Sequence, residues 1–176
     1  MFFCTNAKLN QYLILYTHYN DIANRVKDFM RFYRIFKNIT YSIIRKRTFG
    51  ARILLISDNK ILLVKHTYQP GWYTVGGGVE RGESPLQAIH RELQEEVGVT
   101  LKTEPKIFSV YYSNLEKRDD YVVLYVANDY EERSVNCREI LAKEWFELNN
   151  LPQDTTAATK RRINEYLGNC LISETW

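Results

Sequence analysis

The sequence predicts an α/β fold in which a mixed β-sheet is sandwiched between α-helices. The chain has 176 residues, of which 45% are hydrophobic and 14% aromatic, and this is enough for one well-filled core. From residue 40 onward, short β-rich segments alternate with two helical patterns, an order typical of a sheet covered by helices. We find no internal repeat and no low-complexity linker.

The chain divides by charge into a basic N-terminal part and a mildly acidic remainder. Residues 1–48 hold nine Lys or Arg against Asp21 and Asp28, a formal charge of +7, so the rest of the chain carries −4 of the total +3. We expect a helical extension at 1–39, the main domain at 40–170 and a C-terminal tail at 171–176. An acidic domain does not attract polyanions by bulk charge, so a phosphate substrate would need a local counter-charge such as a bound cation.

The extension is predicted to contain an amphipathic helix from Asp21 to Lys37. Apolar residues recur there at three- and four-residue spacing: Ile22, Val26, Phe29, Tyr33 and Phe36. Basic residues fill other positions, as in helices that rest on anionic surfaces. We favour docking on the domain over such binding, because the aromatic content suits packing.

The first strands of the domain are marked by β-rich segments and a turn. Thr40 to Ile44 and Ala51 to Ser57 are β-rich, and Asp58-Asn59-Lys60 is a turn before the apolar run Ile61 to Val64. Ala51 to Ser57, the turn and Ile61 to Val64 together predict a hairpin. Trp72 to Val75 is expected to be a short strand that ends in three glycines.

A well-marked helix follows. Ser84 is the expected N-cap, Pro85 takes the first helical position, and Gln87 completes a capping box. Gly98 is expected to end the helix. Its apolar stripe, which predicts packing against a sheet, consists of Leu86, Ile89, Leu93 and Val97.

The remaining elements are three strands and a closing helix. Ile107 to Tyr112 and Tyr121 to Ala127 are expected to be strands joined by a polar turn. Glu144 to Leu148 is expected to be another strand, and Thr155 to Leu167 a helix.

Three carboxylates on the central helix carry the functional signal. Glu92, Glu95 and Glu96 lie at i, i+3 and i+4, so their side chains should share one helix face and repel one another. A hard divalent cation reverses that repulsion, and Mg²⁺ or Mn²⁺ prefers such oxygen ligands. From these residues alone, a solvated acidic helix face is an equally good interpretation.

The spacing around these carboxylates distinguishes the two interpretations. From Gly77 the chain has five residues, Glu83, seven residues, Arg91-Glu92-Leu93, one residue, Glu95-Glu96, one residue and Gly98-Val99. This segment resembles the Nudix box at every defining position. The resemblance, to a bacterial subgroup, covers most of residues 40–168, and it implies the Nudix α/β/α sandwich. One departure, Thr74-Val75 where many relatives have Leu-Pro, bears on substrate fit rather than on hydrolysis.

The resemblance implies a metal-dependent pyrophosphohydrolase. Glu92, Glu95 and Glu96 would bind Mg²⁺ (or Mn²⁺) directly. The carbonyl of Gly77 would lie near the same cation, and Glu83 would reach it directly or through water. Each of these carboxylates has a purely structural role as its alternative, most readily the loop residue Glu83.

Two further roles follow from the resemblance. Arg91 would orient the glutamates by charge-assisted hydrogen bonds, with a simple surface salt bridge as the alternative. Relatives differ in which carboxylate accepts the proton of the attacking water, so Glu92 and Glu139 are both candidates. An ordinary exposed loop position is an equally good interpretation of Glu139.

Other polar and aromatic residues are weaker candidates. No histidine is a good metal ligand, since His90 lies away from the carboxylates and His66 is isolated in sequence. Aromatic residues that could stack a base, but are more often core, are Trp72, Tyr73, Tyr111 and Tyr112. Asp119 and Asp120 are expected to be solvated in a turn.

The expected substrate is a small nucleotide-like diphosphate, that is, a nucleoside diphosphate linked to another group. The alternatives are a non-catalytic Nudix-fold nucleotide-binding or regulatory module, although no box glutamate is lost, and a hydrolase of RNA 5′ ends that uses the basic extension. We expect no DNA partner; the sequence is compatible with a monomer or a homodimer. The three cysteines are scattered, and no apolar run approaches the roughly 20 residues of a membrane span, so we expect a cytoplasmic protein.

Overall fold

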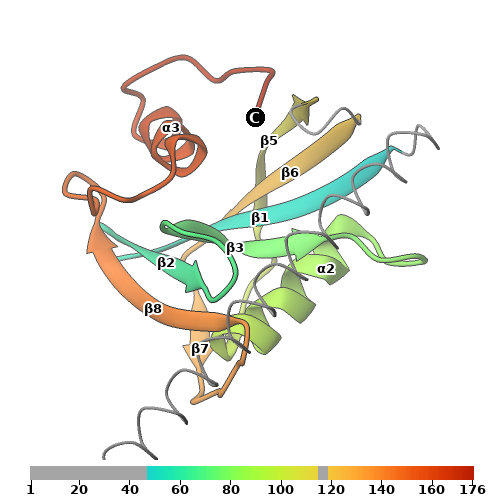
Figure 1. Ribbon diagram of the computed structural model, residues 1–176, viewed down its shortest axis with the longest axis vertical. Helices are drawn as coiled ribbons and strands as arrows, with labels where there is room; N and C mark the ends of the chain where they lie inside the picture. The colour runs from blue at the N-terminus through green and yellow to red at the C-terminus, as the bar shows by residue number, and fades with distance from the viewer. Residues whose placement is uncertain (1–46, 115–118) are drawn as a thin grey trace, which may run out of the picture. The chain divides into compact units, whose positions relative to one another are not determined.

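The computed structural model describes residues 47–114 and 119–176 (Figure 1). The helix expected at Asp21 to Lys37 and the β-rich segment Thr40 to Ile44 lie outside the described residues. Within the two described ranges, no helix is both long and apolar enough to cross a membrane.

Strands, two α-helices and one π-helical turn make up the described chain. The strands are β1 (Thr48–Ser57), β2 (Lys60–His66), β3 (Tyr73–Gly78), β4 (Val99–Leu101), β5 (Lys106–Ser113), β6 (Asp120–Ala127), β7 (Tyr130–Glu132) and β8 (Ile140–Glu147). The helical elements are α2 (Pro85–Glu92), the π-helical turn η1 (Leu93–Val97) and α3 (Ala157–Tyr166).

The principal sheet is mixed, as the sequence predicts. Its strand order is β5-β6-β1-β3-β2-β8, and β4 pairs with β7 in a separate ladder. β1 runs parallel to β6, whereas its pairings with β2 and β3 are antiparallel. The expected hairpin is confirmed: β1 and β2 are joined through Asp58 and Asn59, which have φ values of 47° and 64°. Two positive φ values in succession suit the twist of a two-residue hairpin turn.

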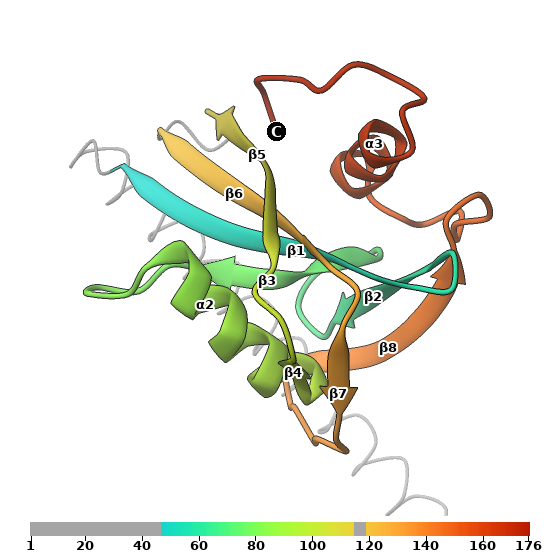
Figure 2. The same ribbon diagram turned by 180° about the vertical axis from the view of Figure 1, so that it is seen from behind.

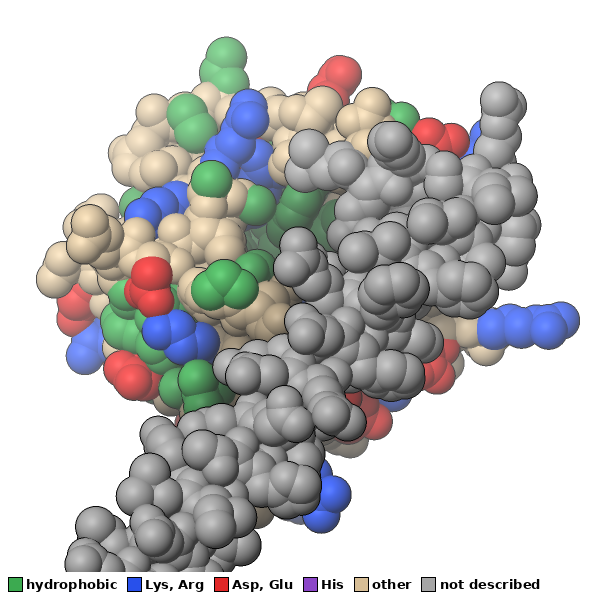
Figure 3. Space-filling model, viewed as in Figure 1, with side chains coloured by type: hydrophobic (Ala, Val, Ile, Leu, Met, Phe, Trp, Pro, Cys, Tyr) green, Lys and Arg blue, Asp and Glu red, His purple; other side chains and the backbone are tan. Residues whose placement is uncertain are grey.

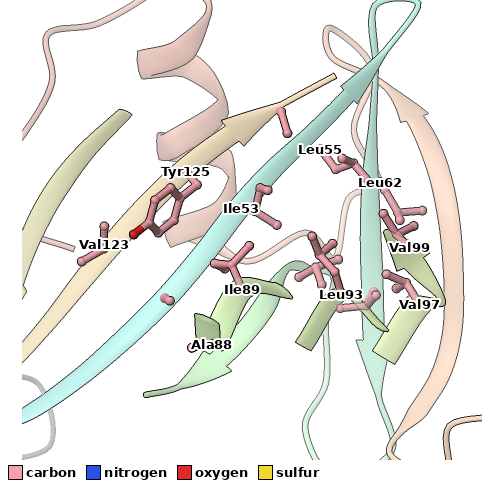
Figure 4. Close-up of a cluster of buried hydrophobic side chains, with 14 residues drawn as sticks. Ile53, Leu55, Leu62, Ala88, Ile89, Leu93, Val97, Val99, Val123 and Tyr125 are labelled. Atoms are coloured by element: carbon pink, nitrogen blue, oxygen red, sulfur yellow. The ribbon is translucent and has the colours of Figure 1, made fainter. Parts of the chain in front are cut away.

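Alternate residues of β1 supply two hydrophobic cores, one on each face of the sheet. Ile53 and Leu55 pack with Ile89 of α2 and Leu93 of η1 on one face (Figure 4). On the other face, the second core is built on the intervening residues of β1 and includes Ile163 of α3. The sheet therefore lies between two helical layers, which Figures 1 and 2 show from opposite sides and which confirms the predicted fold class.

The start of α2 follows the predicted capping box. The Ser84 hydroxyl accepts the Gln87 N–H at 3.2 Å, and the Gln87 side chain accepts the Ser84 N–H at 2.8 Å. Gly98 ends the helical segment with φ 71°, a conformation that favours glycine. The expectation of one regular α-helix up to this point is wrong, because η1 is a π-helical turn and its wider winding changes the direction of the side chains that follow.

Some strand bounds differ from the prediction. β3 continues through the glycines to Gly78, because these residues pair with Gly50 to Arg52 of β1. β8 begins at Ile140, earlier than expected, since its first residues pair with the end of β2. β4 and β7 were not predicted; each has three residues and pairs with the other, and Val99 of β4 is buried in the core on the α2 face.

The segment after α3 extends along the edge strand β5. The Tyr112 N–H donates to the carbonyl of Glu174 at 2.8 Å, and the Trp176 N–H donates to the carbonyl of Tyr112 at 2.9 Å. Residues 171–176, which we delimited as a tail, therefore contact the sheet.

A fully buried ion pair lies beneath this segment. Arg162 of α3 donates to Glu165 at 2.9 Å and to the carbonyl of Thr175 at 3.1 Å, and its guanidinium lies 4.0 Å from the centre of the Tyr111 ring. The Tyr111 hydroxyl donates to Glu165 at 2.8 Å. Both charges thus have several partners, which a buried pair requires.

Candidate active site

The end of β3 is built from glycines that have different neighbours. Gly76 has φ 130°, and a Cβ there would lie 3.0 Å from the Cα of Arg52 in β1. A Cβ on Gly77 would lie 2.7 Å from the carboxyl carbon of Glu92 and closer still to its oxygen. A Cβ on Gly78 would meet nothing within 4 Å. The first glycine is thus required by the backbone, and the second leaves room for a carboxylate.

Arg91 of α2 connects the box residues. Its Nε and Nη2 donate to the two carboxylate oxygens of Glu83 at 2.9 and 3.1 Å, a bidentate arrangement. Its Nη1 donates to Glu92 at 2.8 Å and to Glu95 at 3.4 Å, and its Nη2 donates to the carbonyl of Gly78 at 3.1 Å. The hydrogen bond from Arg91 holds the pKa of Glu83 below its ordinary value. One guanidinium therefore joins the loop, the helix and the end of β3.

Glu96 occupies a different environment from the carboxylates around Arg91. It is only 8% exposed, and its Oε2 accepts the Gly76 N–H at 3.2 Å. Burial raises the pKa of Glu96 to about 7, against the hydrogen bond from Gly76 and the positive charge of Arg52, which lower it. Its other oxygen lies 3.9 Å from Nδ1 of His66.

The three helix carboxylates differ in how far they are exposed. The side chain of Glu95 is 61% exposed, whereas those of Glu92 and Glu96 are 14% and 9% exposed. The π-helical turn provides a reason, because Glu95 and Glu96 lie within it. Within residues 47–114 and 119–176, no three acidic, histidine or cysteine side chains are placed to hold a metal ion as they stand.

The donor set nevertheless fits a hard divalent cation in its chemistry. Glu83 and Glu92 accept from different nitrogens of Arg91, Glu96 is buried within reach of the charge on Glu92, and every donor is an oxygen. A cation would also relieve the cost of burying ionised Glu96, which otherwise favours protonation. Small side-chain movements away from Arg91 would be needed.

Three residues beside Glu96 were missed by the sequence analysis. His66 at the end of β2 is 4% exposed, its two ring nitrogens have no hydrogen-bond partner, and burial lowers its pKa to about 4. Its ring lies 5.1 Å from that of Tyr68 and 5.5 Å from that of Tyr73. Arg52 is the third. One signal was present: His66 continues the alternation of Leu62 and Val64, which point to the α2 face.

Glu139 lies close enough to affect the charge on Glu96. Its carbonyl accepts the Thr67 N–H at 2.9 Å, which ties the loop before β8 to the end of β2. The negative charge of Glu139 is among the influences that raise the pKa values of Glu96 and Tyr68. The structure thus brings this distant glutamate to the same region as the box.

The aromatic and aspartate candidates mostly have structural partners. Trp72 and Tyr111 are buried in the core on the α3 face, as the more common role of strand aromatics predicts. The Tyr112 hydroxyl donates to Asp119 at 2.9 Å, and Asp120 accepts the Thr48 hydroxyl at 2.7 Å. These aspartates therefore brace the ends of β1, β5 and β6.

The chain is similar to a known protein family, to curated relatives and to solved structures. The family model of the NUDIX domain matches residues 46–167. A putative 8-oxo-dGTP diphosphatase of Bacillus subtilis is 28% identical over 120 residues, which cover 68% of this chain and 79% of the relative. An oxidized purine nucleoside triphosphate hydrolase of Danio rerio is 30% identical over 104 residues, 57% of this chain and just under two thirds (66%) of the relative.

Shorter and structural matches complete the comparison. An RNA pyrophosphohydrolase of Francisella tularensis is 41% identical, but only over 49 residues, 28% of this chain and 32% of the relative. The crystal structure of a MutT NUDIX hydrolase from Burkholderia pseudomallei has a TM-score of 0.60 at 28% identity and covers 68% of this chain and 97% of that one. A UDP-X diphosphatase, at 21% identity and a TM-score of 0.58, covers 71% of this chain and 65% of that one, and shows the shared fold.

Proposed function

The chain belongs to the NUDIX domain family, and from that membership we propose that it hydrolyses the diphosphate linkage of a nucleoside diphosphate bearing a further group, with nucleoside triphosphates as the first candidates. One observation carries the proposal. Arg91 draws Glu83, Glu92 and the end of β3 together, beside the buried Glu96. Such an array of acidic groups, costly for a fold, suits a site that handles phosphate with a cation.

The residues that would hold Mg²⁺ or Mn²⁺ are Glu92, Glu95 and Glu96, with the Gly77 carbonyl and Glu83. When bound, such a cation neutralises phosphate oxygens and lowers the pKa of an attacking water. The protein's own part is to set the positions of its carboxylates, and fixed hydrogen bonds make such positioning effective.

A carboxylate must accept the proton of that water. Glu92 is bound to Arg91, whereas Glu139 has no ion-pair partner among the described residues. A carboxylate without such a partner can receive a proton without first losing an ion pair, which favours Glu139. Glu92 stays the second candidate.

Nucleoside triphosphates rank first because of how far the relatives match. The two relatives whose names include a nucleoside triphosphate match over 120 and 104 residues, well beyond the box. The RNA pyrophosphohydrolases match over only 47 to 49 residues. On the face shown in Figure 3, basic and acidic side chains of the described residues are interspersed, which does not favour RNA.

The test is a screen of the purified chain against nucleoside triphosphates, nucleotide sugars, dinucleoside polyphosphates and 5′-triphosphate RNA, with Mg²⁺, Mn²⁺ or EDTA. Product masses identify the broken bond. We expect cation-dependent cleavage of at least one nucleoside triphosphate, lost in Glu92→Gln and kept in Glu104→Gln, a matched change at an exposed position. Nucleotide binding without any cleavage would instead show a binding module, and cleavage of RNA alone would show the alternative substrate.

A further inference from the structure

Arg52 is an unexpected residue for its place in the sheet. It interrupts the run Ala51 to Ile56 of β1, whose other members are buried and apolar. Charged residues are rarely placed in such strands without a partner. Among the described residues Arg52 forms no ion pair with a carboxylate at salt-bridge distance, and its side chain donates instead to backbone carbonyls.

Those hydrogen bonds go to the backbone of β3. The Nη1 atom of Arg52 donates to the carbonyl of Thr74 at 3.3 Å and to the carbonyl of Gly76. Arg52 and Gly76 are also direct partners in the β1–β3 register. One guanidinium therefore holds the carbonyls on both sides of Val75.

The N–H of Gly76 makes the connection to the site. It belongs to the Val75–Gly76 peptide and donates to Oε2 of Glu96 at 3.2 Å. Arg52 binds the peptides on either side of it, through the carbonyls of Thr74 and Gly76. The φ of 130° at Gly76 is one that only glycine adopts readily, so other contacts must hold this peptide in place.

We propose that Arg52 is a positioning residue: by binding the peptides on both sides of the Val75–Gly76 peptide, it fixes the N–H that holds the Glu96 carboxylate in place for the reaction. Its effect on turnover rests on the proposed function, whereas its effect on the Val75–Gly76 peptide does not. Arg52 acts on Glu96 through the backbone of β3 and needs no contact with the substrate.

The first readout is amide hydrogen exchange at Gly76, measured by NMR in the full chain. In Arg52→Gln we expect this exchange to accelerate at least about tenfold, while core amides such as Leu54 stay protected. Arg47→Gln removes the same charge from an exposed position just before β1 and should leave Gly76 unchanged. Unchanged exchange at Gly76 in Arg52→Gln would overturn the proposal.

The second readout is steady-state kinetics on the substrate found by the screen, with Mg²⁺ present. Arg52→Gln should lower kcat at least about tenfold with KM within about twofold, and Arg52→Lys should fall between it and wild type. Combined with Glu96→Gln, the Arg52 change should have little further effect, because both act on one carboxylate. A raised KM with unchanged kcat would instead assign Arg52 to substrate binding and overturn the proposal.

Two outcomes separate this inference from the proposed function. If the wild-type chain hydrolyses nothing in the screen, the proposed function fails, and the exchange of Gly76 still decides whether Arg52 positions its peptide. If Arg52→Gln does not fold, Arg52→Lys takes its place, and wild-type kcat together with wild-type exchange in that variant would overturn the proposal.

Discussion

The room that Gly77 leaves for Glu92 can be filled by a single methyl group. In Gly77→Ala the new Cβ would lie 2.7 Å from the carboxyl carbon of Glu92, whereas carbon atoms prefer separations of about 3.5–4.0 Å. The carboxylate, which now accepts from Arg91, must therefore move by about 1 Å out of its present position. Since Gly77 does not have a positive φ, its own backbone tolerates alanine.

The expected result is a loss of activity without a loss of folding. A displacement of about 1 Å in a catalytic array costs about a hundredfold in rate, so kcat/KM should fall by about that factor, about 3 kcal/mol of transition-state stabilisation. The melting temperature should change little, because the far end of the Glu92 side chain can move. The assay pairs initial rates with thermal melts on the same preparation.

The two adjacent glycines provide controls of opposite kind. Gly78→Ala should leave both rate and melting temperature near wild type, since its Cβ meets nothing within 4 Å. Gly76→Ala should lower the free energy of unfolding by at least about 2 kcal/mol, because its φ of 130° and the approach of β1 exclude a side chain. Near-normal kcat/KM in Gly77→Ala, or an equal loss in Gly78→Ala, would refute the reasoning.

Four further predictions follow from the same structure. Hydrolysis should require a divalent cation, and full activity in EDTA would contradict the assigned carboxylates. Glu96→Gln should lower turnover by at least about a hundredfold. In the metal-free wild type, Glu96 of the folded chain keeps its proton between its ordinary pKa near 4.5 and its raised pKa of about 7. The free energy of unfolding should therefore fall by about 3 kcal/mol as the pH rises through this window. Urea melts should show this loss, and Glu96→Gln should remove it. Arg162→Leu should cost about 3 kcal/mol, because it strands buried Glu165, with kcat/KM within about twofold; unchanged melts would contradict the buried pair.

Features that depend on neighbouring residues in the chain were predictable. Ser84 caps α2 through Gln87, three positions away, and Gly98 ends the helical segment by its own φ. The hairpin at Asp58 is local in the same sense. The spacing of the box residues likewise indicated which side chains would lie near one another on and before α2.

Features that depend on strand register were not predictable. The partners of Arg52 lie 22 and 24 positions along the chain, and they meet it only because β1 and β3 pair in one register. His66 reaches Glu96 in the same way, and the alternation that places His66 on the α2 face could not identify this neighbour. The π-helical turn escaped prediction because α- and π-turns of the same length are not distinguished by apolar spacing.

The contact between the end of the chain and β5 has a consequence for solubility. β5 is an outer strand of the principal sheet, and an outer strand with free backbone groups is a template for association with another molecule. Glu174 and Trp176 occupy both backbone groups of Tyr112, while Ile107 and Val110 on the same strand are exposed. Removing residues 171–176 would open that strand beside two exposed apolar side chains. A version shortened for crystallisation or tagging at this end would therefore be prone to form strand-paired aggregates, even with the α2 face of the sheet untouched.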